Sequence, residues 1–368
     1  MKLSELLEMT ITGEWGEECE GINGVRVLRT TNFTNIGVLS FDKVVVRNIP
    51  KEKVLKKQLK KGDIIVEKSG GTKETPVGRV VYFESNEEYL CNNFTQVLRA
   101  NEELVNPKYL FYCLFAYYQF RVTEKLYNKT TGIQNLQMGR YLELPIPVVE
   151  RDKQDKVCRE LDQLFDLIAK RKEEISLLDD LVKSQFIEMF DGKNLPEMSL
   201  DELSLGKGEY GAQSASIPYN KNRPRYVRIT DINEDGTLNE DFVSSINTED
   251  DMAYKLSEGD FLFARMGATV GKTYAYKNGN EIFAGYLIRY KLNCQIIDPE
   301  YLFWFTKTPK YLTWVKLNQS GAAQPGINAK KYGSLRIPVP PIEEQRRFTR
   351  FVEQTDKSKN VFEMEVAA

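Results

Sequence analysis

The chain has 368 residues, of which 41% are hydrophobic and 28% charged, with a formal net charge of −2 and a pI of about 5.7. This length suits two or three domains, and the composition is typical of a globular protein without a membrane span. The chain has no histidine and no CxxC pair, which excludes Ser–His and Cys–His nucleophiles and argues against a structural zinc site.

The N-terminal segment MKLSELLEMTITGEW lacks the basic, apolar and small-residue sections of a signal peptide. The cysteines are odd in number and scattered along the chain, which favours reduced thiols over a disulfide framework. We therefore expect a cytoplasmic protein.

The first half begins with a β-rich portion. Its strand patterns are GDIIVE (62–67), GRVVYFE (78–84) and TQVLRA (95–100). An amphipathic helix is predicted from the Asn-Pro cap over residues 107–126. Its aromatic series YLFYCLFAYYQF (109–120) is interpreted as core packing, with a base-stacking surface as the alternative. An amide-rich loop and a proline ramp, LPIPV, follow.

A long helix is predicted from about residue 151 to 190, because this stretch has no Pro or Gly and carries an a/d heptad pattern. Such a helix is a rod of roughly 60 Å. Gly192 and Pro196 end it. The predicted seam residues in this helix are Val157, Leu161, Leu164, Ile168, Ile175, Leu178 and Val182.

The second half repeats the first in the same order. LRTTNFTNIGVL (28–39) matches VRITDINEDGTL (227–238), LKKGDIIVEKSGGT (59–72) matches LSEGDFLFARMGAT (256–269), and NPKYLFYCLF (106–115) matches DPEYLFWFTK (298–307). The offset drifts only from 199 to 191 residues. The chain is therefore a tandem repeat.

The repeat predicts strands in GDFLFAR, GKTYAYK and YLIRYKL, a helix over residues 299–316, and a second, shorter long helix after Pro340-Pro341. Phe348 and Val352 occupy the places of Val157 and Leu161, 191 residues on. One such apolar a/d stripe indicates a helix packed on its own domain. Two equivalent stripes favour two helices packed against each other, and the helices are antiparallel if a pseudo-two-fold axis relates the repeats.

No catalytic motif was found. GATVGKT (267–273) resembles a phosphate-binding loop, but Met266 stands where the first glycine is needed and a strand pattern follows it. No S-adenosylmethionine, dinucleotide or nuclease signature was identified. Glu343 and Glu344 stand at a helix start, where acids suit the positive end of the helix dipole.

The remaining polar features indicate recognition. Small, polar loops follow the two GD turns, where glycine amides and hydroxyls suit phosphates, and cations and amides suit base edges. Ordinary turns and turn caps are the alternative. The candidate DNA-binding residues are Arg29, Thr31, Lys68, Ser69, Gly70, Gly71, Thr72, Lys73, Gln134 and Asn135 in the first half, and Arg228, Thr230, Arg265, Met266, Gly267, Thr269, Lys272, Gln324 and Asn328 in the second.

Taken in order, the repeated motifs resemble the specificity (S) subunit of type I restriction-modification systems. These motifs are GDIIVEKSGG/GDFLFARMGA, NPKYL/DPEYL, TTGIQNL/SGAAQPGIN and LPIPV/LRIPVPPIEEQ. The resemblance covers nearly the whole chain. It implies an α+β fold with two target recognition domains, 1–150 and 192–341. A spacer helix follows each domain: a long one over residues 151–191 and a shorter one over residues 342–368. The two helices pack as an antiparallel coiled coil.

The resemblance further implies a subunit that binds double-stranded DNA at a bipartite target and has no catalytic residues, cofactor or metal of its own. S-adenosylmethionine, ATP and Mg would belong to two methyltransferase (M) subunits and to restriction (R) subunits where these join. Two other classes stay open: a carboxylate-based enzyme with duplicated domains, and a coiled-coil scaffold without DNA specificity.

Overall fold

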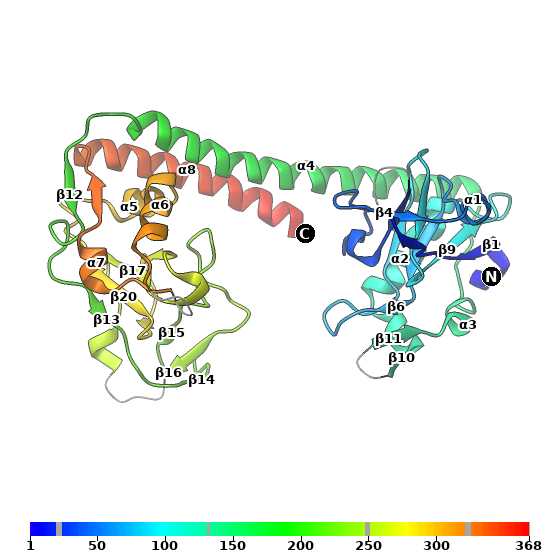
Figure 1. Cartoon of the computed structure of the whole chain (residues 1–368), viewed down its shortest axis with the longest axis horizontal. Helices are drawn as coiled ribbons and strands as arrows, with labels where there is room; N and C mark the ends of the chain where they lie inside the picture. Colours follow the sequence, from blue (N-terminus) through cyan, green and yellow to red (C-terminus); the bar gives the residue numbers. More distant parts are fainter. Residues whose placement is uncertain (20–23, 131–132, 247–250, 321–324, 368) are drawn as a thin grey trace. The chain divides into compact units, whose positions relative to one another are not determined.

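Figure 1 shows the computed structural model of the chain, which describes residues 1–19, 24–130, 133–246, 251–320 and 325–367. The chain divides into two compact units, residues 1–167 and 168–368. The long helix α4 (Arg151–Phe190) contributes its first part to unit 1 and the rest to unit 2. None of the helices in the described ranges is long and apolar enough to cross a membrane.

Unit 1 is a β-rich body with short helices. Its elements before α4 are, in chain order, η1 (Leu3–Leu6), β1 (Leu7–Thr12), β2 (Glu17–Glu18), β3 (Val25–Leu28), η2 (Thr30–Asn32), β4 (Val45–Asn48), α1 (Lys51–Lys57), β5 (Ile64–Glu67), β6 (Ser69–Gly70), β7 (Val80–Tyr82), β8 (Tyr89–Cys91), β9 (Thr95–Ala100), α2 (Pro107–Gln119), η3 (Val122–Leu126), β10 (Tyr127–Thr130), β11 (Ile133–Leu136) and α3 (Met138–Tyr141). Its sheets have the orders β1-β9-β5-β7, β2-β4-β3-β8 and β10-β11-β6.

Unit 2 repeats this plan after α4. Its elements are β12 (Glu197–Ser199), β13 (Glu209–Tyr210), β14 (Ser216–Pro218), β15 (Arg225–Val227), β16 (Ser244–Ile246), η4 (Asp251–Tyr254), β17 (Asp260–Ala264), η5 (Gly267–Thr269), β18 (Thr273–Ala275), β19 (Glu281–Phe283), β20 (Leu287–Lys291), α5 (Pro299–Phe305), α6 (Pro309–Asn318), α7 (Ala329–Gly333), β21 (Arg336–Pro338) and α8 (Ile342–Ala367). The sheet β13-β20-β17-β18 repeats β1-β9-β5-β7 strand for strand, and a parallel pair, β3–β8 or β15–β19, occurs in each unit. A mixed α and β fold with two domains is therefore confirmed.

The GD turns launch the central strand of each unit. Gly62 and Gly259 have φ of +96° and +86°, a left-handed conformation that favours glycine. The aspartates that follow, Asp63 and Asp260, are buried. Each accepts a hydrogen bond from the backbone three residues earlier and pairs with an arginine of the neighbouring strand. The repeated GD dipeptide thus builds a turn and a buried ion pair.

Equivalent positions fill the two cores. Ile64 and Val66 of β5 correspond to Phe261 and Phe263 of β17, and all four are fully buried. Continuous apolar runs are buried on both faces because helices and further strands cover them. The aromatic series of α2 is also core, since most of its large side chains are buried. This agrees with the packing interpretation.

The helix predicted over residues 299–316 is two helices, α5 and α6, with a break between Phe305 and Pro309. Proline has no amide to continue the α5 ladder, and the Thr308 side chain caps α6 by accepting from the Tyr311 amide. The helix predicted over 107–126 likewise ends at Gln119, and a 3-10 turn, η3, follows Arg121 with φ +59°.

A buried glutamine joins each long helix to its own unit. Gln154 Oε1 accepts from the Asn106 amide at 2.8 Å, and its Nε2 donates to Val149 O. Gln345 repeats both contacts, 191 residues on, with the Asp298 amide and Pro340 O, and adds a bond to Ile296 O. Both side chains are at most 2% exposed. This clamp fixes the first turn of the helix against the capped helix α2 or α5.

Replacing Gln345 by alanine should lower the free energy of unfolding of unit 2 by about 3 kcal/mol. The substitution leaves buried backbone groups of Asp298 and Pro340 without partners, each worth about 1–3 kcal/mol. Denaturant unfolding measures this loss. Gln354→Ala, at an exposed position of the same helix, is the control and should change stability by less than about 0.5 kcal/mol. Equal effects of the two substitutions would contradict the clamp.

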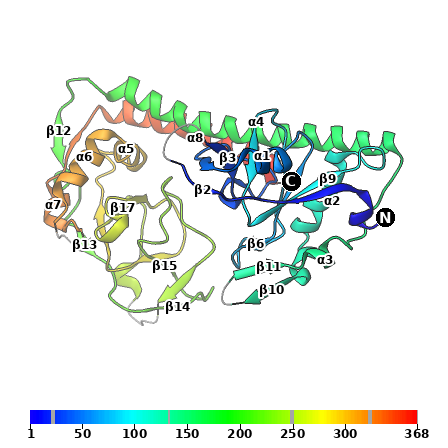
Figure 2. The same ribbon diagram turned by 45° about the vertical axis from the view of Figure 1, so that its right-hand side comes forward.

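Within unit 2, α8 runs alongside the later part of α4 in both views (Figures 1 and 2). Phe348 packs its ring on Phe186 at 5.3 Å, Lys359 pairs with Asp179 at 3.0 Å, and Arg171 pairs with Glu365 at 2.8 Å. The residue numbers of the partners rise along α8 as they fall along α4, so the two segments are antiparallel.

The predicted seam residues divide between the two units. Val157 and Leu161 pack against the core of unit 1, whereas Val182, Phe348 and Val352 are buried in the core of unit 2. Ile168, Ile175 and Leu178 are half-buried on α4. Leu164 differs from the prediction, since it is 50% exposed. The contacts with α8 named above end at Arg171, so Leu164 lies beyond them on α4.

Candidate functional site

The first platform is the loop after β5, residues 68–75, together with β11. β6 pairs antiparallel with β11, which places Ser69 opposite Asn135 and Gly70 opposite Gln134. Ser69 Oγ lies 2.8 Å from Asn135 Oδ1 and donates a hydrogen bond to it. The structure therefore brings together the small-residue loop and the amide loop, which the sequence offered as separate candidates. Asn135 is exposed on this surface.

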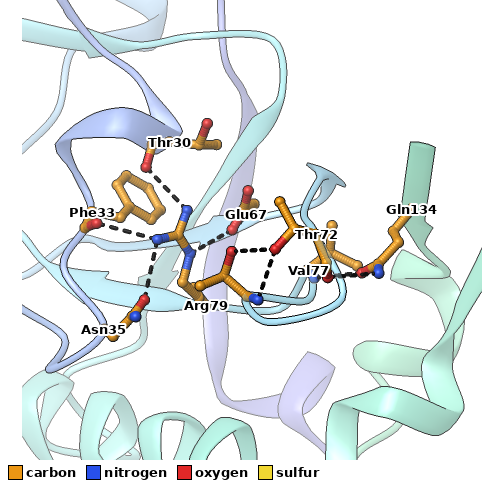
Figure 3. Close-up of polar contacts among 9 residues, drawn as sticks. Thr30, Phe33, Asn35, Glu67, Thr72, Val77, Arg79 and Gln134 are labelled. Atoms are coloured by element: carbon orange, nitrogen blue, oxygen red, sulfur yellow. Dashed lines mark hydrogen bonds and ion pairs between the residues drawn. The ribbon is translucent and has the colours of Figure 1, made fainter. Parts of the chain in front are cut away.

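Gln134 is buried beneath the loop of the first platform and forms hydrogen bonds to its backbone. Its Oε1 accepts from the Val77 amide at 3.1 Å, and its Nε2 donates to Thr72 O at 2.9 Å (Figure 3). Only 4% of this residue is exposed. The structure thus gives Gln134 a role inside the loop in place of the base contact that its amide suggested.

Arg79 closes the far end of the same loop (Figure 3). Its Nε donates to the buried carboxylate of Glu67 at 2.7 Å, and its Nη atoms donate to Thr30 O, Phe33 O and Asn35 Oδ1. Burial raises the pKa of Glu67, and the guanidinium opposes that shift. Arg79 is therefore committed to holding the loop against the turn after β3.

The loop tip is the exposed part of the first platform. Thr72 and Thr75 bond to each other through side chain and backbone, and Lys73 lies exposed between them. Gly71 has φ +62°, and a Cβ there would lie 2.8 Å from the Val77 amide nitrogen. Glycine is required here for a close backbone approach within the loop.

The second platform, residues 265–269 with 325–327, has the same backbone pattern. Met266 pairs with Gly326 as Ser69 pairs with Asn135, and Arg265 O accepts from the Ile327 amide at 2.9 Å. Gly267, with φ +72°, has open space where a Cβ would be, among the described atoms. Thr269 Oγ1 donates to Met266 O at 3.3 Å. The strand β18 follows, which agrees with rejecting a phosphate-binding loop.

The structure describes one of the two amide candidates of the second half. Asn328 caps α7, since its side chain accepts from the Lys331 amide at 2.9 Å. This matches the turn-cap alternative. Gln324 lies outside the described residues.

Lys272 repeats the role of Arg79. Its Nζ donates to Ile232 O at 3.3 Å and pairs with Glu234 at 2.8 Å. Ile232 and Glu234 stand 199 residues after Phe33 and Asn35, which Arg79 contacts. The cation that ends each platform loop is therefore structural.

Arg29 and Arg228 are also engaged within their units. The Arg29 amide donates to Asn32 Oδ1, and its guanidinium donates to Lys43 O at 3.4 Å. Arg228 forms the equivalent bonds to Asp231, at 2.8–3.0 Å, and to Phe242 O. Both arginines fasten a turn to the loop that follows it.

The threonines beside these arginines, Thr31 and Thr230, are exposed. Thr230 Oγ1 also donates to Asp231 Oδ1 at 3.2 Å.

A cleft of about 820 Å³ in unit 2 is a poor place for phosphates. Its lining includes the acids Glu234, Asp235, Glu281, Glu300 and Asp356. Burial raises the pKa of Glu281 and of Asp356, because the surroundings disfavour their charged forms. Cations also line the cleft, but carboxylates already pair with Arg225, Lys277 and Lys359.

One feature of the platforms was missed in the sequence. Phe94 and Tyr286 precede the equivalent strands β9 and β20, and they are 47% and 57% exposed. Their backbone carbonyls accept from the amides of Lys68 and Arg265, at 2.9 and 3.0 Å. The signal was present as an aromatic residue directly before TQVLRA in one repeat and LIRYKL in the other.

Comparison with known proteins gives a consistent result. The family model described as "Type I restriction modification DNA specificity domain" matches residues 17–177 and again residues 197–365. The "Putative type I restriction enzyme MjaX specificity subunit" of Methanocaldococcus jannaschii is 24% identical over 378 residues, covering 96% of this chain and 86% of that protein. The EcoBI specificity subunit of Escherichia coli is 30% identical over 131 residues, 35% of this chain and 27% of that protein.

Solved structures show the same fold. The S subunit of a type I restriction-modification system from M. genitalium aligns with a TM-score of 0.58 at 18% identity, covering 100% of this chain and 91% of that one. A chain from a study of complex assembly and conformational transition of the type I R-M system aligns with a TM-score of 0.56 at 17% identity, covering 100% and 92%.

Proposed function

Because this chain belongs to the family of type I restriction-modification DNA specificity proteins, we propose that it selects a bipartite DNA sequence for a methyltransferase. It is a DNA sequence-specificity subunit, and such subunits are non-catalytic. The observation that carries the split target is the doubling of the platform: one chain holds two surfaces with the same backbone pattern.

We propose that residues 1–150 and 192–341 are the two recognition domains and that α4 and α8 form the spacer. The antiparallel contacts of Phe348, Lys359 and Glu365 with α4 support a coiled coil. The glutamine clamps support it too, since a spacer transmits a distance only through rigid joints. The half-buried and exposed residues of the two platforms are the proposed DNA-contacting set. In the first platform these include half-buried Ser69 and exposed Asn135, Lys73 and Thr72.

The proposed partners are double-stranded DNA, two methyltransferase subunits and, in complexes that cut DNA, restriction subunits. S-adenosylmethionine, ATP and Mg then belong to those partners. The charge balance supports partners that share the phosphate contacts, because a net charge of −2 provides little long-range attraction to DNA. We propose a cytoplasmic location, where such a complex meets its DNA.

The test is methyl transfer from radiolabelled S-adenosylmethionine to DNA by the purified partner methyltransferase, with and without this chain. We expect transfer to one split sequence only when both proteins are present. This chain alone should transfer nothing. The scaffold alternative requires instead that the complex assembles and methylates with no preference for sequence.

A further inference from the structure

An exposed aromatic residue stands beside a cation at the same place on each platform. Phe94 O accepts from the amides of Lys68 and Ser69, at 2.9 and 3.1 Å, and Tyr286 O accepts from the Arg265 amide at 3.0 Å. These bonds fix both aromatic residues at the ends of the central strands β5 and β17. Their side chains stay 47% and 57% exposed although the residues that follow them are buried.

Three cations around the platforms are already neutralised. Carboxylates pair with Arg79, Arg228 and Lys272 at 2.7–2.8 Å. These side chains are therefore committed within their units, and none of them can turn toward a phosphate without breaking an ion pair.

Lys68 and Arg265 differ from those cations, since neither forms a salt bridge within the described part of the chain. Lys68 is half-buried, and burial lowers the pKa of its amine. Arg265 lies over the Tyr210 ring at 4.7 Å and donates only to a carbonyl, Gly285 O, at 3.4 Å. A partly desolvated cation without a carboxylate partner favours binding of an external anion.

We propose that Lys68 with Phe94, and Arg265 with Tyr286, form the point where each domain grips duplex DNA, an inference that rests on the proposed function. The cation neutralises a backbone phosphate, and the aromatic ring contacts a base step, as apolar groups contact a thymine methyl or wedge into a step. Phosphate contacts position the domain, and the aromatic contact contributes to the choice of sequence.

The two members of each pair have different expected signatures. Lys68→Ala should weaken DNA binding by the complex on all sequences alike and reduce the slope of log affinity against log salt by about 1. Phe94→Ala should relax discrimination at one base pair of the first half-site by about tenfold and leave the second half-site unchanged. Tyr286→Ala should do the same in the second half-site only.

The experiment is methylation of a DNA library randomised in both half-sites by the assembled complex, read by sequencing, together with a salt titration of binding. Lys60→Ala and Leu104→Ala are matched controls. Both are exposed residues of unit 1, and they lie beyond the opposite ends of β5 and β9. The controls should change neither half-site.

The outcomes separate the two claims. If the unaltered complex selects a split sequence but Phe94→Ala and Tyr286→Ala keep its full discrimination, the aromatic contact is refuted while the function stands. If either substitution lowers the yield of assembled complex instead, the surface binds a partner protein and the proposal is wrong. If the unaltered complex has no preference among sequences, the function itself fails.

Discussion

Insertion of seven residues between Leu167 and Ile168 of α4 is expected to widen the gap between the half-sites by about three base pairs, with both half-site sequences unchanged. Seven helical residues add about 10 Å, and base pairs are spaced by about 3.4 Å. The insertion point spares Phe165, which packs on Tyr112 of unit 1, and precedes the Arg171–Glu365 pair. Both sets of helix contacts can therefore persist.

A five-residue insertion at the same point is the control. Seven residues are within about 20° of two whole turns, whereas five residues rotate one part of α4 against the other by roughly 140°. Methylation at any split sequence should then be lost. Sequencing of methylated library DNA measures both variants. A changed half-site sequence with an unchanged gap would contradict the spacer role of α4.

Exchange of residues 1–145 for those of a different allele is expected to replace the first half-site completely and leave the second unchanged. The boundary lies where the chain returns to pair with the N-terminal segment. Leu3 N donates to Leu144 O, and Lys2 forms a β-bridge with Pro145. The donor allele should carry Asn or Asp at position 106, so that the side-chain cap of α2 is kept and the backbone amide of residue 106 stays in place for Gln154.

The reciprocal exchange of residues 192–341 provides the matched comparison and should replace only the second half-site. Library methylation measures both chimaeras. The idea of independent recognition domains would be abandoned if either exchange altered both half-sites. If a chimaera loses all methylation, its assembly with the methyltransferase is measured. A chimaera that assembles but stays inactive also counts against independent recognition domains.

The sequence was sufficient to predict the repeat, the central strands and the long helices. The apolar runs IIV and FLFA directly follow the GD turns, and the stretch from Arg151 to Phe190 contains neither Pro nor Gly. These signals are local, so they could be identified without tertiary information. The break between α5 and α6 was also encoded locally, in Thr308-Pro309, but the helical pattern around it was given more weight.

The candidate site was harder to predict because residue type does not reveal which partners are already satisfied. Gln134, Arg29, Arg228 and Lys272 have side chains suited to DNA, yet their hydrogen bonds lie within the units. Those bonds join residues 3 to 62 positions apart in the chain. Phe94 and Tyr286 were overlooked for the opposite reason, since an aromatic residue before a strand is ordinarily core.

The most direct test of the account is single-molecule sequencing of genomic DNA from cells with and without this gene, to map modified adenines. We predict that deletion removes methylation from one split motif, two short half-sites around a fixed non-specific gap, and from no other sequence. An unchanged methylation map, with the gene expressed and the partner methyltransferase intact, would contradict the specificity role and favour the scaffold alternative.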